Sequence, residues 1–154
     1  MKRVVSFLLV FLALLAASSA LMLSGTAPQW LLAKHVWIFS MIAGGVGGAL
    51  YCLRGVYLNA CVRKNWDEAW LPWYFIRPFA SVICGGISCL VLKAGLLILE
   101  ANQQPGSTEL GFYAFAVVAG LNVDKFVAKV EDIAQATWGI EKSRTSAPEP
   151  KKEE

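Results

Sequence analysis

The chain has few charged residues. Lys, Arg, Asp and Glu together make up 16% of its 154 residues, and the formal net charge at pH 7 is only +3. Soluble domains carry about 25% charged residues, so this composition argues against an ordinary soluble enzyme. The positive charges are spread over short connecting segments and form no dense basic face, so we expect no nucleic-acid partner.

Residues that commonly carry chemistry are also few and scattered. The only histidine is His35, and the four cysteines, Cys52, Cys61, Cys84 and Cys89, include no Cys-x-x-Cys pair. This set predicts neither a disulfide framework nor a zinc site. No phosphate-loop or nucleophile-elbow pattern occurs. We therefore expect no metal ion, no cofactor, no catalytic residue and no enzymatic activity.

Long apolar runs dominate the chain instead. Hydrophobic residues make up 56% of it, and they gather in residues 4–23, 36–53, 79–99 and 110–123. About 20 helical residues cross a hydrocarbon core of about 30 Å. In lipid, every backbone polar group must be satisfied within the protein, which favours helices. These runs predict an all-α, polytopic transmembrane bundle of four spans within residues 1–123.

The first and fourth runs leave alternatives open. Lys2 and Arg3 precede the first run and small residues occupy positions 18–20, as in a cleaved signal. We favour an uncleaved anchor because apolar residues resume at positions 21–23. The fourth run is short, and it spans only if its polar flank extends it to about 107–123; a re-entrant or interfacial segment is the alternative.

The basic residues predict the orientation of the chain. If the N-terminus is cytoplasmic, every Lys and Arg except Lys34 and Lys93 falls in a cytoplasmic segment. Cationic loops resist translocation across the membrane. We therefore predict that both termini lie in the cytoplasm.

An aromatic and charged segment, residues 62–77, separates the second and third predicted spans. Tryptophan and tyrosine rings settle at the headgroup level, so this segment is predicted to lie at the cytoplasmic interface. An aromatic cage for a cationic ligand is the alternative. The predicted interfacial anchors are Trp66, Trp70, Trp73, Tyr74 and Arg77.

Small residues recur at every fourth position in the second and third predicted spans. Such ridges let helix backbones approach closely in lipid. We predict that the two ridges pack together within one chain, with a contact between subunits as the alternative. The helix-packing residues are Ser40, Gly44, Gly48 and Cys52 in one span and Ser81, Gly85 and Cys89 in the other.

Lys93 is a possible intramembrane polar site. It follows Gly85 and Cys89 at the next four-residue step, inside the predicted third span. One interpretation is that its stem snorkels to the outer interface, toward Glu100. The other is that it lines a polar cavity or pore, because charges inside a membrane are costly and often functional.

Two segments follow the predicted spans, residues 124–142 and residues 143–154. Residues 124–142 are predicted to form a cytoplasmic amphipathic helix, with Phe126, Val130 and Ile133 on its apolar face. Its charges are of both signs, so self-association or docking is favoured over lipid sensing. Residues 143–154 are predicted to be a disordered tail.

Residues 73–79 (Trp-Tyr-Phe-Ile-Arg-Pro-Phe), the glycines Gly85, Gly86 and Gly95, and the Ala-Gly-Leu-Asn sequence at 119–122 form a recognisable combination. Over about residues 70–140 the chain resembles a family of small uncharacterised bacterial multispan membrane proteins. In these proteins an Arg-Pro opens a span and an Ala-Gly-Phe-Ser-like turn closes the last one; here Leu-Asn replaces Phe-Ser. The resemblance implies a bacterial inner-membrane location but no activity and no site residue.

These observations predict a small integral membrane component that interacts with the lipid bilayer and with itself or another membrane protein. A homo-oligomeric pore or membrane-permeabilising effector is the alternative, based on Lys93, the small-residue ridges and the short fourth run.

Overall fold

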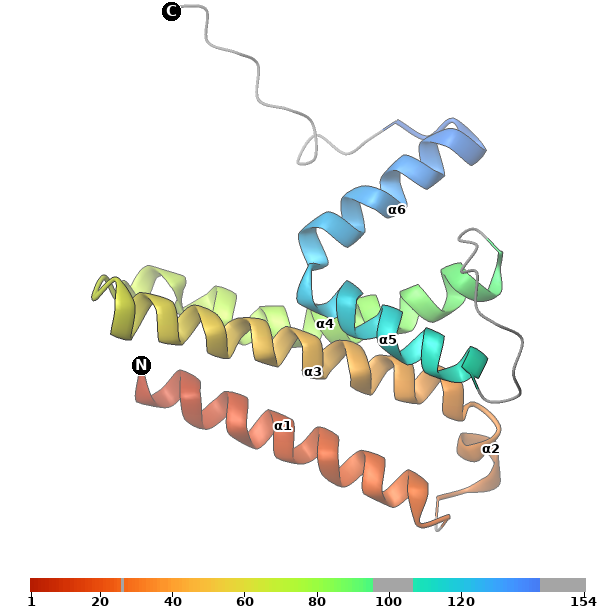
Figure 1. Cartoon of the computed structure of the whole chain (residues 1–154), viewed down its shortest axis with the longest axis horizontal. Coiled ribbons are helices and arrows are strands. Elements are labelled where there is room, and N and C mark those ends of the chain that lie inside the picture. Colours follow the sequence, from red (N-terminus) through yellow and green to blue (C-terminus); the bar gives the residue numbers. More distant parts are fainter. Residues whose placement is uncertain (26, 96–106, 142–154) are drawn as a thin grey trace, which may run out of the picture. The chain divides into compact units, whose positions relative to one another are not determined.

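The computed structural model describes residues 1–25, 27–95 and 107–141 (Figure 1). These described residues are almost entirely helical and contain no strand, which confirms the predicted all-α class. The chain divides into two compact units, Met1–Val123 and Asp124–Glu154. The predicted tail, residues 143–154, lies outside the described residues, as does the predicted end of the third span.

The described residues of the first unit form five α-helices and two short helical turns. Its α-helices are α1 (Lys2–Leu23), the short α2 (Gln29–Leu32), α3 (His35–Tyr57), α4 (Leu71–Lys93) and α5 (Ser107–Leu121). Between α3 and α4 lie the π-helical turn η1 (Leu58–Val62) and the 3-10 turn η2 (Glu68–Trp70).

Three helical segments of the described chain are long and apolar enough to cross a membrane. They are Lys2–Leu23, His35–Val62 and Glu68–Lys93. A fourth is counted only if Glu109–Leu121 and the following helix together form one broken span. Length and composition thus support three or four spans.

Helix α4 begins and ends earlier than the predicted third span, 79–99. The prediction used Pro78 as the start because proline suits the first turn of a helix. In the structure Pro72 occupies the first turn and Pro78 lies inside the helix, so the second half of the predicted interfacial segment is helical. The helix ends at Lys93, followed by Gly95 with φ of +71°. A glycine in the left-handed region commonly follows a helix end.

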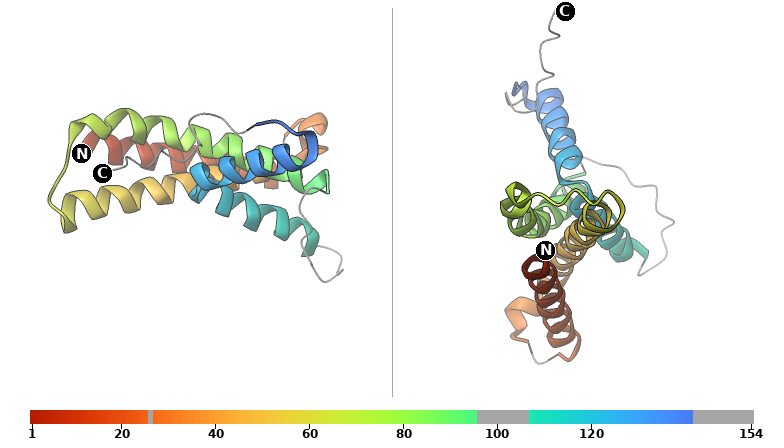
Figure 2. Two further views of the ribbon diagram at one scale, coloured as in Figure 1. Left: turned by 90° about the horizontal axis from the view of Figure 1, so that it is seen from above. Right: turned by 90° about the vertical axis from the view of Figure 1, so that its left-hand side faces the viewer.

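Helix α3 is the centre of the first unit, because α1, α4 and α5 all pack against it (Figure 1, Figure 2). Helices α3 and α4 are antiparallel: Gly44 approaches Gly85, while Gly48 lies against Ser81. Helix α5 runs parallel to α3, since Glu109 lies near His35 at one end and Gly120 lies against Gly44 at the other.

Helix α1 attaches to the bundle by its N-terminal half. Val4 and Leu8 are fully buried in a cluster with residues of α3 and α4. The rings of Phe7 and Phe75 have centroids 4.8 Å apart, and those of Phe11 and Phe79 are 5.5 Å apart. The opposite face of α1 exposes Leu9, Val10 and Leu14, as a lipid-facing surface does.

The described part of the second unit is dominated by α6 (Val123–Trp138). Phe126, Val130 and Ile133 recur on one face of this helix at spacings of four and three, as predicted. The helix is shorter than the predicted 124–142 because Gly139, with φ of +68°, ends it.

Candidate functional site

The two predicted small-residue ridges meet at the centre of the α3–α4 pair. All seven residues of these ridges are buried. A Cβ atom added at Gly44 would lie 2.5 Å from the Ser81 carbonyl oxygen and 2.7 Å from the Gly85 Cα. The two backbones are therefore in direct contact, and only glycine fits at these crossing points. The ridges are used for packing within the chain.

A third helix, α5, joins the same crossing point. An added Cβ at Gly120 would collide with the backbone of Gly44, and one at Gly47 would collide with the Val117 carbonyl. Gly120 is not among the predicted helix-packing residues, so this contact was not predicted from the sequence. The signal was present, because Ala116 and Gly120 have the same four-residue spacing as the other ridges and Ala116 is fully buried.

Helix α5 ends beside the middle of its neighbours. Its last residues contact Gly44 and Ser81, which lie near the midpoints of α3 and α4. At about 1.5 Å per residue, its 15 residues span about 22 Å, less than a hydrocarbon core of about 30 Å. The chain therefore leaves its helical path, at Asn122, at the level where α3 and α4 are halfway along.

Such a helix end leaves carbonyl oxygens without partners in the helix itself. Two residues of α4 supply donors. The Ser81 hydroxyl lies 3.0 Å from the Gly120 carbonyl oxygen, and an Arg77 Nη lies 3.5 Å from that of Leu121. The Asn122 amide also donates to the Val118 carbonyl oxygen at 3.3 Å. A cation at this position also interacts favourably with the helix dipole.

Arg77 is held in a buried aromatic environment. Only 5% of it is exposed. Its guanidinium carbon lies 4.3 Å from the ring centroid of Tyr51 on α3 and 4.8 Å from that of Trp73 on α4. These distances are in the range of cation–π interactions, which are stronger when water is excluded.

The predicted interfacial anchors therefore divide into two groups. Tyr74 and Arg77 are buried inside the bundle, because the early start of α4 turns them toward α3. Trp66 and Trp73 are half-buried, while Trp70 is 58% exposed. Among these residues, Trp70 has the exposure expected of a ring at a membrane surface.

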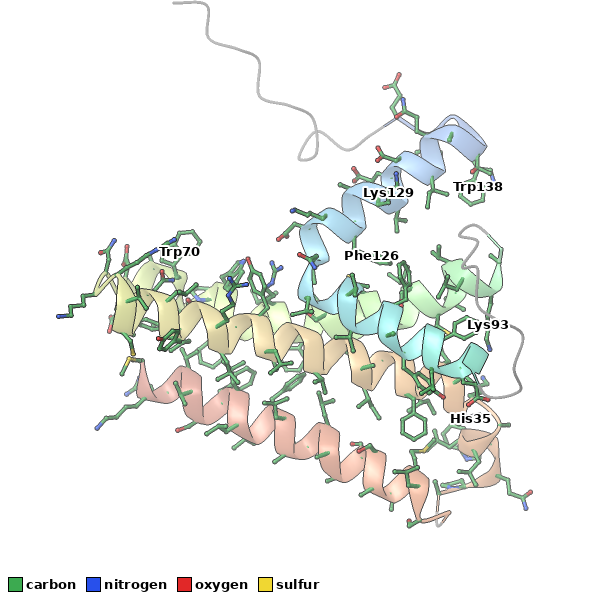
Figure 3. All side chains as sticks on the ribbon, viewed as in Figure 1. His35, Trp70, Lys93, Phe126, Lys129 and Trp138 are labelled. Carbon is green, nitrogen blue, oxygen red and sulfur yellow. The ribbon has the colours of Figure 1, made fainter. Side chains whose placement is uncertain are left out.

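A cavity of about 590 Å³ is lined by residues of α3, α4 and the segment between them. It lies at the end of the α3–α4 pair where Trp70 is found, and Figure 3 labels this residue. Its aromatic wall includes Tyr51, Trp70 and Trp73, and Arg54 and Arg63 supply positive charge. The alternative of an aromatic cage for a cation fits this cavity poorly, because the two arginines would repel a cationic ligand.

Lys93 lies at the opposite end of α4 from Trp70 (Figure 3). It is the last residue of the helix and its side chain is exposed. A lysine in the last turn of a helix interacts favourably with the helix dipole. Glu100, its predicted partner, lies outside the described residues. On the same end, His35 Nε2 lies 3.3 Å from Glu109 Oε1.

The described ranges contain no cluster of three or more His, Cys, Asp or Glu that could hold a metal ion. Comparison with protein-family models, curated proteins and solved structures finds no match. The resemblance to small bacterial multispan membrane proteins therefore stays a prediction.

Proposed function

We propose that the chain is a non-catalytic integral membrane component of the bacterial inner membrane that binds another copy of itself or another protein through α6. In this proposal the α1–α5 bundle anchors the chain in the bilayer, with both termini in the cytoplasm. In this orientation every Lys and Arg except Lys34 and Lys93 falls in a cytoplasmic segment, and this distribution supports the proposal.

The exposed apolar side chains of α6 carry the proposal. Val127 is 42% exposed and Trp138 is 64% exposed, on a helix that also has Asp124, Lys125 and Lys129. Large exposed apolar side chains often mark interaction surfaces. A helix that binds anionic lipid is typically rich in Lys and Arg on its polar face, whereas the charges of α6 have both signs. Another protein surface therefore suits this helix better than lipid does.

The packing of the bundle leaves α6 as the candidate contact surface. The small-residue ridges of α3, α4 and α5 are occupied by one another, so they are not available as a surface between subunits. On α6 Phe126 is buried, whereas Val127 and Trp138 stay exposed, so these two side chains are available to a partner.

The mass of the complex in mild detergent tests the proposal. We expect the full chain to form a particle containing more than one polypeptide, and Val127→Asp with Trp138→Ser to reduce it to single chains. Lys125→Ser with Lys129→Ser is the matched control and should leave the mass unchanged.

Two results would contradict the proposal. One is a wild-type chain that is monomeric and has no co-purifying protein; the other is leakage of vesicle contents, which would favour the pore alternative. Tags at each terminus, read in intact cells, test the orientation separately.

A further inference from the structure

The cavity at the Trp70 end of the bundle combines chemical groups that are not explained by packing. It holds about 590 Å³ and is open on one side, so a small ligand group can enter it. Ligand sites commonly have volumes of about 300–1,000 Å³, with apolar walls and a few polar groups that fix orientation. The size and the mixed lining of this cavity meet that description.

The charges that line the cavity favour an anion. Arg54 comes from the last turns of α3 and Arg63 follows η1, so two segments each place an arginine in the lining. The lining also contains one carboxylate, Asp67, whose Oδ1 accepts a hydrogen bond from the Ala69 N–H at 2.9 Å. The arginines outnumber this carboxylate, which is already engaged in capping η2.

The groups on the walls fit a phosphate at a membrane surface. Arginine presents several N–H donors in a planar fork that matches phosphate oxygens. The Asn59 amide lies 3.2 Å from the Tyr74 hydroxyl, which fixes a polar group on the inner wall. Trp70 and Trp73 provide apolar surface beside these donors. Basic pockets between membrane helices on the cytoplasmic side are a known way to hold lipid headgroups.

The segment between α3 and α4 that lines part of the cavity has an unusual backbone. It contains the π-helical turn η1 and Lys64, whose φ of +52° is rare for a residue other than glycine. Single π-helical turns and strained residues are often found at functional sites.

We propose that this cavity binds the phosphate group of an anionic ligand, with Arg54 and Arg63 as the main contacts. The phosphate has two possible sources, the headgroup of an anionic phospholipid and a soluble phosphate ester. The proposal rests on the membrane placement proposed above, which co-flotation of the full chain with vesicles measures independently.

The test uses native mass spectrometry of the full chain in mild detergent. Phosphatidylglycerol and phosphatidylcholine form the lipid arm, and glycerol 3-phosphate forms the soluble arm. Because hydrogen bonds to charged groups are strong, we expect Arg54→Gln with Arg63→Gln to weaken binding at least ~10-fold. Lys125→Gln with Lys129→Gln removes the same charge from α6 and should leave binding unchanged.

Each outcome decides the question. Retention of phosphatidylglycerol over phosphatidylcholine, lost in the double variant, supports the proposal with a lipid source. Binding of glycerol 3-phosphate alone, lost in the same variant, supports it with a soluble source. Absence of both, or equal binding by the double variant, overturns it even if the chain floats with vesicles. Should the double variant not fold, Arg63→Gln alone changes an exposed residue outside the helices and should give a smaller loss.

Discussion

The Ser81 hydroxyl donates to the carbonyl oxygens of Arg77, at 2.9 Å, and Gly120, at 3.0 Å. A hydroxyl has only one proton, so it is shared between its own helix and the end of α5. This contact joins α4 to α5 where the backbones of α3, α4 and α5 meet.

Gly44→Ala should destabilise the bundle. The new Cβ would lie within 3 Å of backbone atoms of Ser81 and Gly85, which cannot move without separating the helices. Overpacking of this kind costs about 1–3 kcal/mol. The midpoint of thermal unfolding in detergent should fall. Gly111→Ala is the control, because nothing lies within 4 Å of that Cβ position and alanine favours a helix. Equal midpoints for both variants would contradict the packing described.

Ser81→Ala should lower the free energy of unfolding by about 1 kcal/mol, the usual net contribution of one hydrogen bond. It should also speed amide exchange near the end of α5, because the Gly120 carbonyl loses a donor from α4. Ser18→Ala removes a hydroxyl that bonds only within α1 and is the comparison. If exchange rates in α5 are the same in both variants, Ser81 does not support that helix end.

Arg77→Met should loosen the end of α5 more than Ser81→Ala does. The substitution keeps an apolar stem but removes the guanidinium between Tyr51 and Trp73 and its contact with the Leu121 carbonyl. Hydrogen exchange over residues 118–121 should increase. Arg3→Met alters an exposed arginine and should have no such effect. Unchanged protection in the Arg77 variant would mean that its charge is not needed there.

Lys93→Met should alter neither folding nor ion flux through reconstituted vesicles. Lys93 is exposed at the last residue of α4, where an apolar replacement removes only a favourable dipole contact of about 0.3–1 kcal/mol. A wild-type flux that disappears in this variant would instead place Lys93 in a pathway and support a pore.

Much of the helical packing could be predicted from the sequence. The four-residue spacing of small residues identified Gly44 and Gly85, because close backbone approach leaves a direct mark on residue type. The long apolar runs identified the three long helices, although their ends shifted. Pro72 and Pro78 both suit a first helical turn, and only the three-dimensional packing distinguishes them.

The environment of Arg77 could not be predicted in this way. An arginine among tryptophans and tyrosines resembles a membrane-surface belt when it is seen only in sequence. Its burial depends on Tyr51, which is 26 positions away on another helix, and on the end of α5, which comes later still. The cavity was missed for the same reason, since its residues come from α3, the two helical turns, the loop between these turns and α4.

The short length of α5 has a consequence for biogenesis. The donors near the last two carbonyl oxygens of α5, those of Gly120 and Leu121, belong to Ser81 and Arg77 of α4. The end of α5 as the structure has it therefore depends on α4 being in place. Synthesis from the N-terminus supplies the helices in the order α3, α4, α5, so the α4 donors are already made when the end of α5 needs them.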